Sequence, residues 1–403
     1  MSNRIKLPDG SVREYEEGAS IKTPDSAERL KTERRNSRGT RRLAALDAAR
    51  GLAVIGMFLQ HFALTEKNAS IVSGNTTLLF VLCGGISYSI MARRMMDQGT
   101  ETTVFRARML ARAVFIDVIG YLLIMLNTPF GVILPAYAAL FVLGLILVRR
   151  STRVHVATAA VLVVVCPPLM VLGGSVLSGA SLLNDIAGGP MSALALAPVF
   201  VAGMAIGRLD ITKTRNALSL AGGGAIMFLI GRMLGAFVLP GLSRSFEEWL
   251  IKVLGTVGAQ PPDPYAIWPL NTEPPLWNSL LWTAPHSAST FQTLTGMGAA
   301  FLVLGLACLV PRKTSAVLIP FAAVGRVALT MYAAQFVVIW VLRLAGIEFG
   351  FGEVPFGDLL VAIVTLVTGW LIARLPTGPL EALMRHFDRL FSVSRPSTVP
   401  ASR

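Results

Sequence analysis

The sequence predicts an all-α membrane protein, a polytopic bundle of transmembrane helices, and three observations carry this prediction. Of the 403 residues, 53% are hydrophobic and only 15% are charged, whereas about 25% of the residues of a soluble domain are charged. The mean hydropathy is +0.62. Long apolar segments recur along the chain, and most are long enough to cross the hydrocarbon core of a bilayer as a helix.

We predict about ten membrane spans from these segments. They lie near residues 43–65, 71–91, 109–126, 130–148, 156–178, 190–208, 216–239, 293–311, 319–345 and 357–376.

Cations gather in alternate loops between these spans. Arginines crowd the loops near residues 93–108 and 149–153, whereas loops such as 66–70 and 127–129 hold few cations. By the positive-inside rule, the arginine-rich loops and both termini are cytoplasmic. The net charge of +13 is therefore explained by membrane orientation, and no basic platform with aromatic residues indicates a nucleic-acid partner.

We expect the protein to be located in the plasma membrane of the cell, and its predicted organisation has three parts. Residues 1–40 are polar and are expected to form a disordered cytoplasmic tail, followed by a transmembrane domain over 41–376 and a second cytoplasmic tail over 377–403. The outer loop at 240–292 is long and holds several tryptophans, which suits a partly ordered cap at the membrane interface.

Three cysteines, Cys83, Cys166 and Cys308, all lie within apolar stretches. We expect them to be small buried side chains rather than metal ligands or disulfide partners, and no metal site is predicted. The composition does not fix the oligomeric state.

The most informative segment runs from Asp47 through Arg50 to His61. In a helix these 14 steps rise about 21 Å, most of a bilayer's hydrocarbon core, and Arg50 and His61 share one face to within about 20°. Asp47 and Arg50 are spaced as a local ion pair, but Arg50 also suits a cationic site at the cytoplasmic mouth of a pocket. His61 near the outer end is either an interfacial side chain or a general base.

Further polar residues extend both ends of this arrangement. Arg108 and Arg112 add cations on the cytoplasmic side, either as anchors or as part of the mouth, and Asp117 lies deeper in the same span. His286 in the outer loop precedes Ser287, which allows a nucleophile pair or simply a loop that caps the next span.

The first of these segments resembles a known group. Leu46-Asp47-x-x-Arg50-Gly51 with His61 resembles the first helix of bacterial membrane proteins related to heparan-alpha-glucosaminide N-acetyltransferase. Many members of that superfamily carry Asn at the position of His61, and the broader acyltransferase-3 group carries His there. The run from Gly74 to Ser87 is similar to the second span of the same proteins.

Two later blocks resemble the DUF418 and DUF1624 families of the same superfamily. Thr283-Ala284-Pro285-His286-Ser287 resembles the segment before a late span, and Gly325-Arg326-Val327-Ala328-Leu329-Thr330-Met331-Tyr332 resembles their G-R-x-x-L-T-x-Y helix.

The resemblance implies acyl transfer, with cytoplasmic acetyl-CoA as donor and a cell-envelope sugar or lipid as acceptor. The arginines would hold the CoA phosphates, and His61 and His286, with Ser287, would work at the outer side. The alternatives are a transporter or lipid-handling protein, which polar residues within spans also fit, and a sensor with its output in the N-terminal tail.

Overall fold

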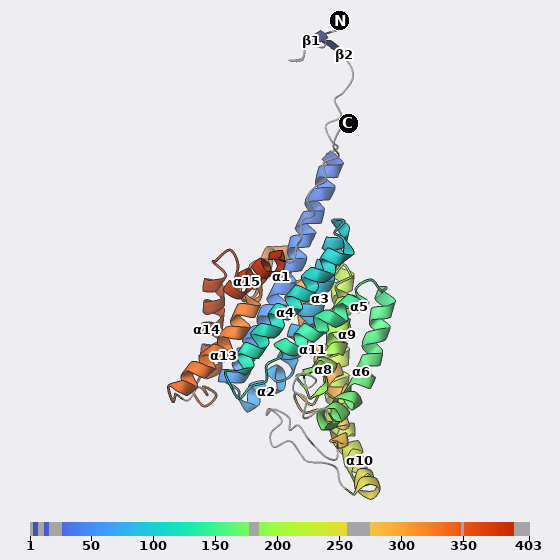
Figure 1. Cartoon of the computed structure of the whole chain (residues 1–403), viewed down its shortest axis with the longest axis vertical. Helices are drawn as coiled ribbons and strands as arrows, with labels where there is room; N and C mark the ends of the chain where they lie inside the picture. Colours follow the sequence, from blue (N-terminus) through green and yellow to red (C-terminus); the bar gives the residue numbers. More distant parts are fainter. Residues whose placement is uncertain are drawn as a thin grey trace. The chain divides into compact units, whose positions relative to one another are not determined.

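The computed structural model describes residues 3–6, 12–15, 26–176, 185–255, 275–347 and 350–390. Its regular elements are helices apart from one short hairpin (Figure 1). The chain divides into two units, Met1–Leu43 and Ala44–Arg403. The predicted all-α class is confirmed for the second unit as far as it is described.

In the first unit, β1 (Asn3–Lys6) pairs antiparallel with β2 (Val12–Tyr15), with Asn3 opposite Tyr15. Helix α1 (Ser26–Phe62) begins in this unit. The two strands and the start of α1 lie within the predicted N-terminal tail over 1–40. The segment from Ser26 is rich in Arg, with Glu, Lys and Leu, and these residues favour a helix even where the sequence is polar.

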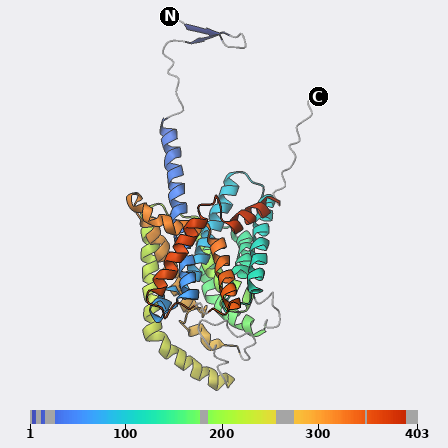
Figure 2. The same ribbon diagram turned by 90° about the vertical axis from the view of Figure 1, so that its left-hand side faces the viewer.

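The second unit is a helical bundle (Figures 1 and 2). After α1 its elements are α2 (Glu66–Val72), α3 (Asn75–Asp97), α4 (Thr102–Ile124), α5 (Leu134–Leu147), α6 (Thr152–Val176), α8 (Ala193–Ile206), α9 (Thr214–Met233), the π-helix η1 (Leu234–Val238), α10 (Leu239–Leu254), the 3-10 helix η2 (Trp277–Leu281), α11 (Thr290–Leu309), the 3-10 helix η3 (Arg312–Leu318), α12 (Ile319–Arg326), α13 (Ala328–Leu344), α14 (Gly357–Ile372) and α15 (Pro379–Leu390).

Several of these helices are suited to cross a membrane. Within the described residues, four helical segments are long and apolar enough: Glu66–Asp97, Thr152–Ser175, Thr214–Leu254 and Thr290–Leu309. Helices α12 and α13, bent by 65°, make a fifth if they count as one broken span, and α5, α8 and α14 are shorter apolar helices. The protein is therefore a membrane protein with several spans, while the number ten and the orientation of the termini stay predictions.

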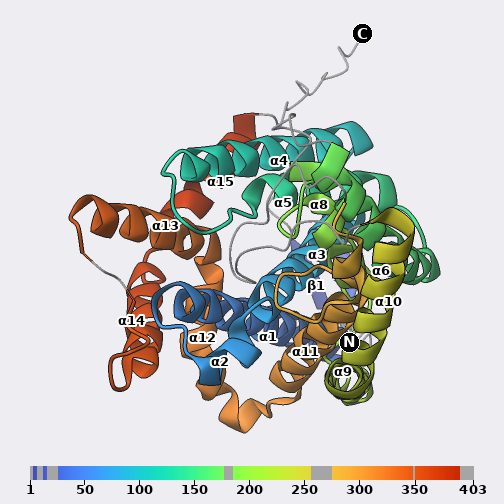
Figure 3. The same cartoon turned by 90° about the horizontal axis from the view of Figure 1, so that it is seen from below.

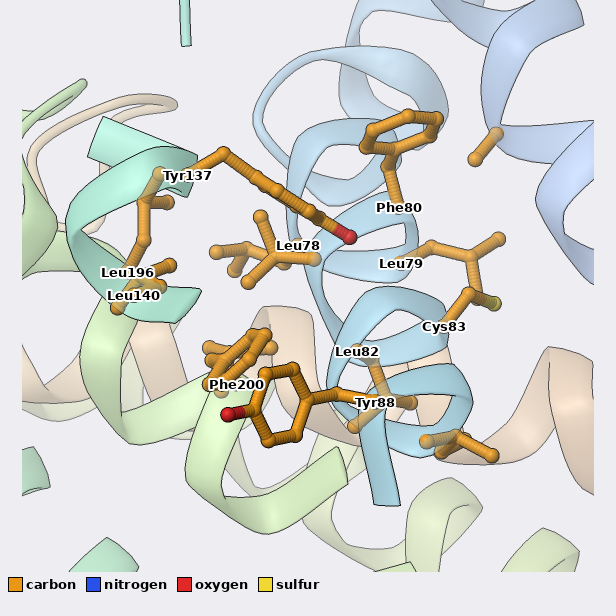
Figure 4. Packing of buried hydrophobic residues seen from close by; sticks show 14 of the residues in the cluster. Leu78, Leu79, Phe80, Leu82, Cys83, Tyr88, Tyr137, Leu140, Leu196 and Phe200 are labelled. Carbon is orange, nitrogen blue, oxygen red and sulfur yellow. The ribbon is translucent and has the colours of Figure 1, made fainter. Parts of the chain in front are cut away.

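Helix α3 lies in the middle of the second unit, beside α1, α8 and α11 (Figure 3). Its residues Leu82 and Tyr88 are completely buried, and Tyr88 packs against Phe200 with ring centroids 5.8 Å apart (Figure 4). By contrast, α9 exposes large apolar side chains such as Ile226 and Ile230. An apolar face of this kind on an outer helix is what lipid would cover.

Small residues allow the closest contacts between helices. A Cβ atom on Gly203 would lie 2.4 Å from the carbonyl oxygen of Leu82, so α8 and α3 meet backbone to backbone. The crossing of α1 and α12 is tighter. A Cβ on Gly51 would lie 1.9 Å from the Phe321 carbonyl oxygen, and a Cβ on Gly325 would lie 1.8 Å from that of Asp47.

The segment predicted as a C-terminal cytoplasmic tail contains the packed helix α15. Glu381 of α15 accepts hydrogen bonds from the backbone N–H groups of Leu329 (2.8 Å) and Thr330 (3.1 Å) at the start of α13. It thereby caps a helix start that would otherwise have unsatisfied donors. Asp388 of α15 pairs with Arg112 of α4. The two acids are seven residues apart and so share one face of α15. Hydropathy does not indicate this helix, because several of its residues are charged.

Candidate functional site

His61 lies in the last turn of α1, in a mostly aromatic setting. Its ring stacks on Phe130 with centroids 4.0 Å apart and meets the edge of Phe336 at 5.9 Å. The side chain of Gln335, from α13, is completely buried and interacts with the same ring. However, Nδ1 of His61 and both amide atoms of Gln335 make no hydrogen bond of normal geometry.

Buried polar atoms without partners are unusual, because each costs about 1–3 kcal/mol. Three such atoms on two interacting side chains suit a place where a bound group completes the hydrogen bonding. Gln335 was not singled out from the sequence, although an amide within the apolar run around Ala334 and Phe336 is a signal that could have found it.

His286 reaches the same place from the loop between η2 and α11. Its Nε2 lies 2.9 Å from Nε2 of Gln60, the neighbour of His61 on α1, across 226 residues of sequence. As placed, the amide donates and Nε2 accepts, which puts the ring proton on Nδ1. His286 is only 7% exposed, and this burial lowers its pKa to about 4, so the ring is neutral at physiological pH.

The loop that holds His286 is held in an uncommon backbone conformation. His286 has φ 59° and Ala288 φ 49°, and non-glycine residues in this left-handed region cluster at functional sites. Ser287 is buried, and its hydroxyl donates to the Trp282 carbonyl oxygen at 3.3 Å. The structure therefore places Ser287 in the framework of the loop, and Ser289, not His286, caps α11 by accepting from the N–H of Gln292 at 3.1 Å.

Arg50 lies about 16 Å along α1 from His61 and joins three helices. Its guanidinium donates to Asp47 Oδ1 at 3.2 Å, to the Gly325 carbonyl oxygen at 3.4 Å, and to the Ser87 hydroxyl of α3. Arg326, which the sequence analysis did not propose for the site, interacts electrostatically with Asp47. The predicted pairing of Asp47 with Arg50 is thus present, within a larger network.

Arg112 of α4 contacts α3 at Met91, one turn along that helix from Ser87. Its Nε lies 2.6 Å from Asp388 Oδ2, and its NH1 contacts the sulfur of Met91. Arg108 interacts with the same carboxylate. Ser87 and Met91 are four residues apart on α3 and so share a face. The structure therefore brings Arg50 and Arg112 to one side of α3, with an acid beside each.

Asp117 does not join this cluster. It lies near Asp185, whose Oδ2 accepts a hydrogen bond from the Tyr121 hydroxyl at 2.5 Å. Burial raises the pKa of the Asp185 carboxyl, and the bond from Tyr121 opposes this shift. Asp117 therefore lies beside Asp185, while Arg112 of the same helix pairs with Asp388.

A polar cleft of about 540 Å³ opens beside the His286 loop. We call it the outer cleft, and its walls come from α2, α3, the end of α9, the start of η1, the loop at Thr283 and Pro285, and α11. It is lined by Glu66, Ala69, Ser70, Ser73, Asn75, Phe228, Gly231, Arg232, Gly235, Ala236, Thr283, Pro285, Gln292 and Thr295.

The described residues contain no group of three or more His, Cys, Asp or Glu side chains placed to hold a metal ion. The three cysteines are all buried, as predicted.

No curated protein and no solved structure matches the chain. One family does match in part. The matched region begins in α10 and ends with α15, so it includes His286, Gln335 and Asp388 but not His61, Arg50 or Arg112. Residues 242–390 match the family described as "Protein of unknown function (DUF418)", which supports the DUF418 relationship predicted from the sequence.

Proposed function

We propose that the protein is an integral-membrane acyltransferase that moves an acyl group, in the simplest case acetyl from cytoplasmic acetyl-CoA, to a cell-envelope sugar or lipid. One observation supports this most. Two histidines far apart in sequence gather at the end of α1, where Nδ1 of His61 is buried and has no partner. Its position favours His61 as the general base, because Nε2 of His286 is already engaged by Gln60.

The proposed transfer needs no further reactant. His61 takes the proton of an acceptor hydroxyl, and the oxygen attacks the thioester carbonyl carbon. The tetrahedral intermediate then collapses, the C–S bond breaks, and the CoA thiolate takes the proton back from the imidazolium. His286 orients the acceptor, and Gln335 offers its amide to the oxyanion.

The donor would enter from the opposite side. Arg50 and Arg112 lie on one side of α3 near the predicted cytoplasmic surface, and guanidinium groups suit the phosphates of CoA. In this proposal the acyl end reaches along α1 towards His61.

The direct test is to incubate the purified protein with acetyl-CoA labelled in the acetyl group and with a cell-envelope extract. We expect the label to move to an extract component only with the wild-type protein. Absence of any labelled product, with a protein that binds CoA, would contradict the enzyme. It would favour the second candidate, a non-enzymatic lipid-handling protein, for which the outer cleft is the supporting observation.

A pair of variants separates a CoA-binding role of Arg112 from its ion pair. We expect Arg112→Gln to weaken acyl-CoA binding about tenfold, as loss of a charged contact does. Asp388→Asn breaks the same ion pair but frees the guanidinium, so CoA binding should stay equal or improve. Arg50→Ala should also weaken binding. Equal CoA affinities in Arg112→Gln and wild type, measured by titration calorimetry, would refute the assignment.

We also propose about ten spans with both termini cytoplasmic and the cell membrane as location. Single cysteines placed at positions 20 and 265 of a cysteine-free variant should then react oppositely with an impermeant thiol reagent in intact cells. Equal labelling of the two positions would contradict this topology.

A further inference from the structure

An apolar groove lies next to the outer cleft. The groove has a volume of about 470 Å³ and runs between α1, α3, α9 and α11, lined by residues such as Leu52, Leu59, Ala299 and Val303. Asn75 and Phe228 line both spaces, so the two are adjacent. From Leu59 to Leu52 the groove follows α1 for about 10 Å, away from the outer end of the helix and towards the membrane interior.

The two spaces differ sharply in chemistry. The outer cleft holds a cation and an anion, Arg232 and Glu66, together with the hydroxyl or amide groups of Ser70, Asn75 and Gln292. The groove walls are almost wholly aliphatic or aromatic. The outer cleft suits the polar part of an amphipathic molecule, and the adjacent groove suits its apolar part. Neither space alone suits the whole molecule.

Two features mark the cleft as a built site. Ser73 is 4% exposed, lines the cleft, and its Oγ has no hydrogen-bond partner. The wall that carries Gly235 and Ala236 is the π-helix η1, a rare conformation that is frequent at functional sites. The small side chains there keep the chamber open beside Arg232.

We infer that the outer cleft and the apolar groove together bind one membrane lipid with a phosphate-linked, hydroxyl-bearing head group. The phosphate pairs with Arg232 in the last turn of α9, and the head-group hydroxyls bond to Ser73, Asn75 and Gln292. One acyl chain lies in the groove. Arg232 is exposed, so the charged end stays at the membrane surface while the chain stays in the apolar layer.

This site also supplies an acceptor for the proposed reaction. Pro285 lines the cleft and precedes His286, and a Cβ on Gly74, between the lining residues Ser73 and Asn75, would lie 3.3 Å from the backbone nitrogen of His286. A head-group hydroxyl bound here is therefore next to the histidine loop. The acceptor role rests on the proposed function, whereas the binding does not.

The experiment titrates the full-length protein in detergent micelles and counts bound ligand by native mass spectrometry, without any acyl donor. The probes are phosphatidylglycerol, diacylglycerol without a head group, and glycerol phosphate without chains. We expect phosphatidylglycerol to bind at least tenfold more tightly than either fragment. Arg232→Gln should weaken it about fivefold, since an exposed charge is partly screened, and should leave diacylglycerol unchanged. Ala299→Phe fills the groove and should weaken both lipids.

Each test variant has a matched control away from the outer cleft and the apolar groove. Arg215→Gln removes an exposed cation at the other end of α9, and Ala160→Phe fills a separate apolar groove between α6, α8, α9 and α11. Neither should change binding. Equal effects of control and test variants, or glycerol phosphate binding as tightly as phosphatidylglycerol, would overturn the inference. Lipid binding in this experiment, together with no labelled product in the separate acetyl-CoA experiment, would overturn only the acceptor role and the proposed function.

Discussion

The His61→Ala protein is expected to lose acyl transfer by about 10²–10⁴-fold, the usual effect of deleting a general base. The physical reason is the environment of the ring. Phe130 and Phe336 hold it in place, and Nδ1 is buried without a partner. CoA binding should change little, because Arg50 lies about 16 Å from His61 along α1 and Arg112 contacts the same side of α3 as Arg50. The measurement is a single-turnover rate with labelled acetyl-CoA, together with a CoA titration.

His155→Ala is the matched control for this variant. His155 is completely buried near the start of α6, outside the site, so it reports the effect of deleting a buried imidazole on folding alone. We expect the His155→Ala protein to retain transfer.

His286→Ala should slow transfer less than His61→Ala, because Nε2 of His286 is already bonded to Gln60. Since the pKa of His286 is about 4, its ring is neutral in the folded protein over pH 6–9 and adds no pH dependence there. Wild-type transfer by the His61→Ala protein across that range would refute the catalytic role.

Gly325→Leu is expected to disrupt the bundle, with a loss of about 3 kcal/mol or more, because overpacking that the backbone cannot relieve is strongly destabilising. The first atom of any side chain at this position would lie 1.8 Å from the carbonyl oxygen of Asp47. The helices α1 and α12 would have to separate, and the bond from Arg50 to the Gly325 carbonyl oxygen would be lost. The measurement is the apparent melting temperature in detergent, followed by size-exclusion chromatography.

Gly223→Leu is the control for this variant. Gly223 lies in α9, and a Cβ there would meet nothing within 4 Å. We expect a stability equal to that of the wild type or slightly higher, because leucine favours a helix more than glycine does. A Gly325→Leu protein as stable as Gly223→Leu would mean that α1 and α12 do not pack as described.

The pairs Arg50-Gly51 and Gly325-Arg326 each combine a packing residue with a charged residue. Both pairs belong to two of the sequence blocks singled out in the sequence analysis. In the structure their glycines serve one purpose, the close crossing of α1 and α12. The adjacent arginines both lie near Asp47. The motif therefore carries packing in its glycines and charge in its arginines.

Local information was enough for the helices and for single residues. Hydropathy over windows of about 20 residues follows directly from the thickness of the bilayer, so the predicted segments overlap the helices of the second unit. Spacing on one helix was likewise sufficient to pair Asp47 with Arg50 and to place His61 in the last turn of α1. Hydropathy does not indicate the part of α1 that begins at Ser26, nor α15. These two segments form helices without a long apolar run.

The sequence by itself determined the class of the protein, the positions of most apolar helices and the histidine and arginine candidates, because these depend on composition and on neighbours within a few turns. Only the tertiary structure decided which residues meet. The pairing of Arg112 with Asp388, the meeting of His286 with Gln60, and the unsatisfied Gln335 beside His61 all join distant segments. Such contacts are set by how helix faces pack around α3, and no periodicity within one segment encodes its partner.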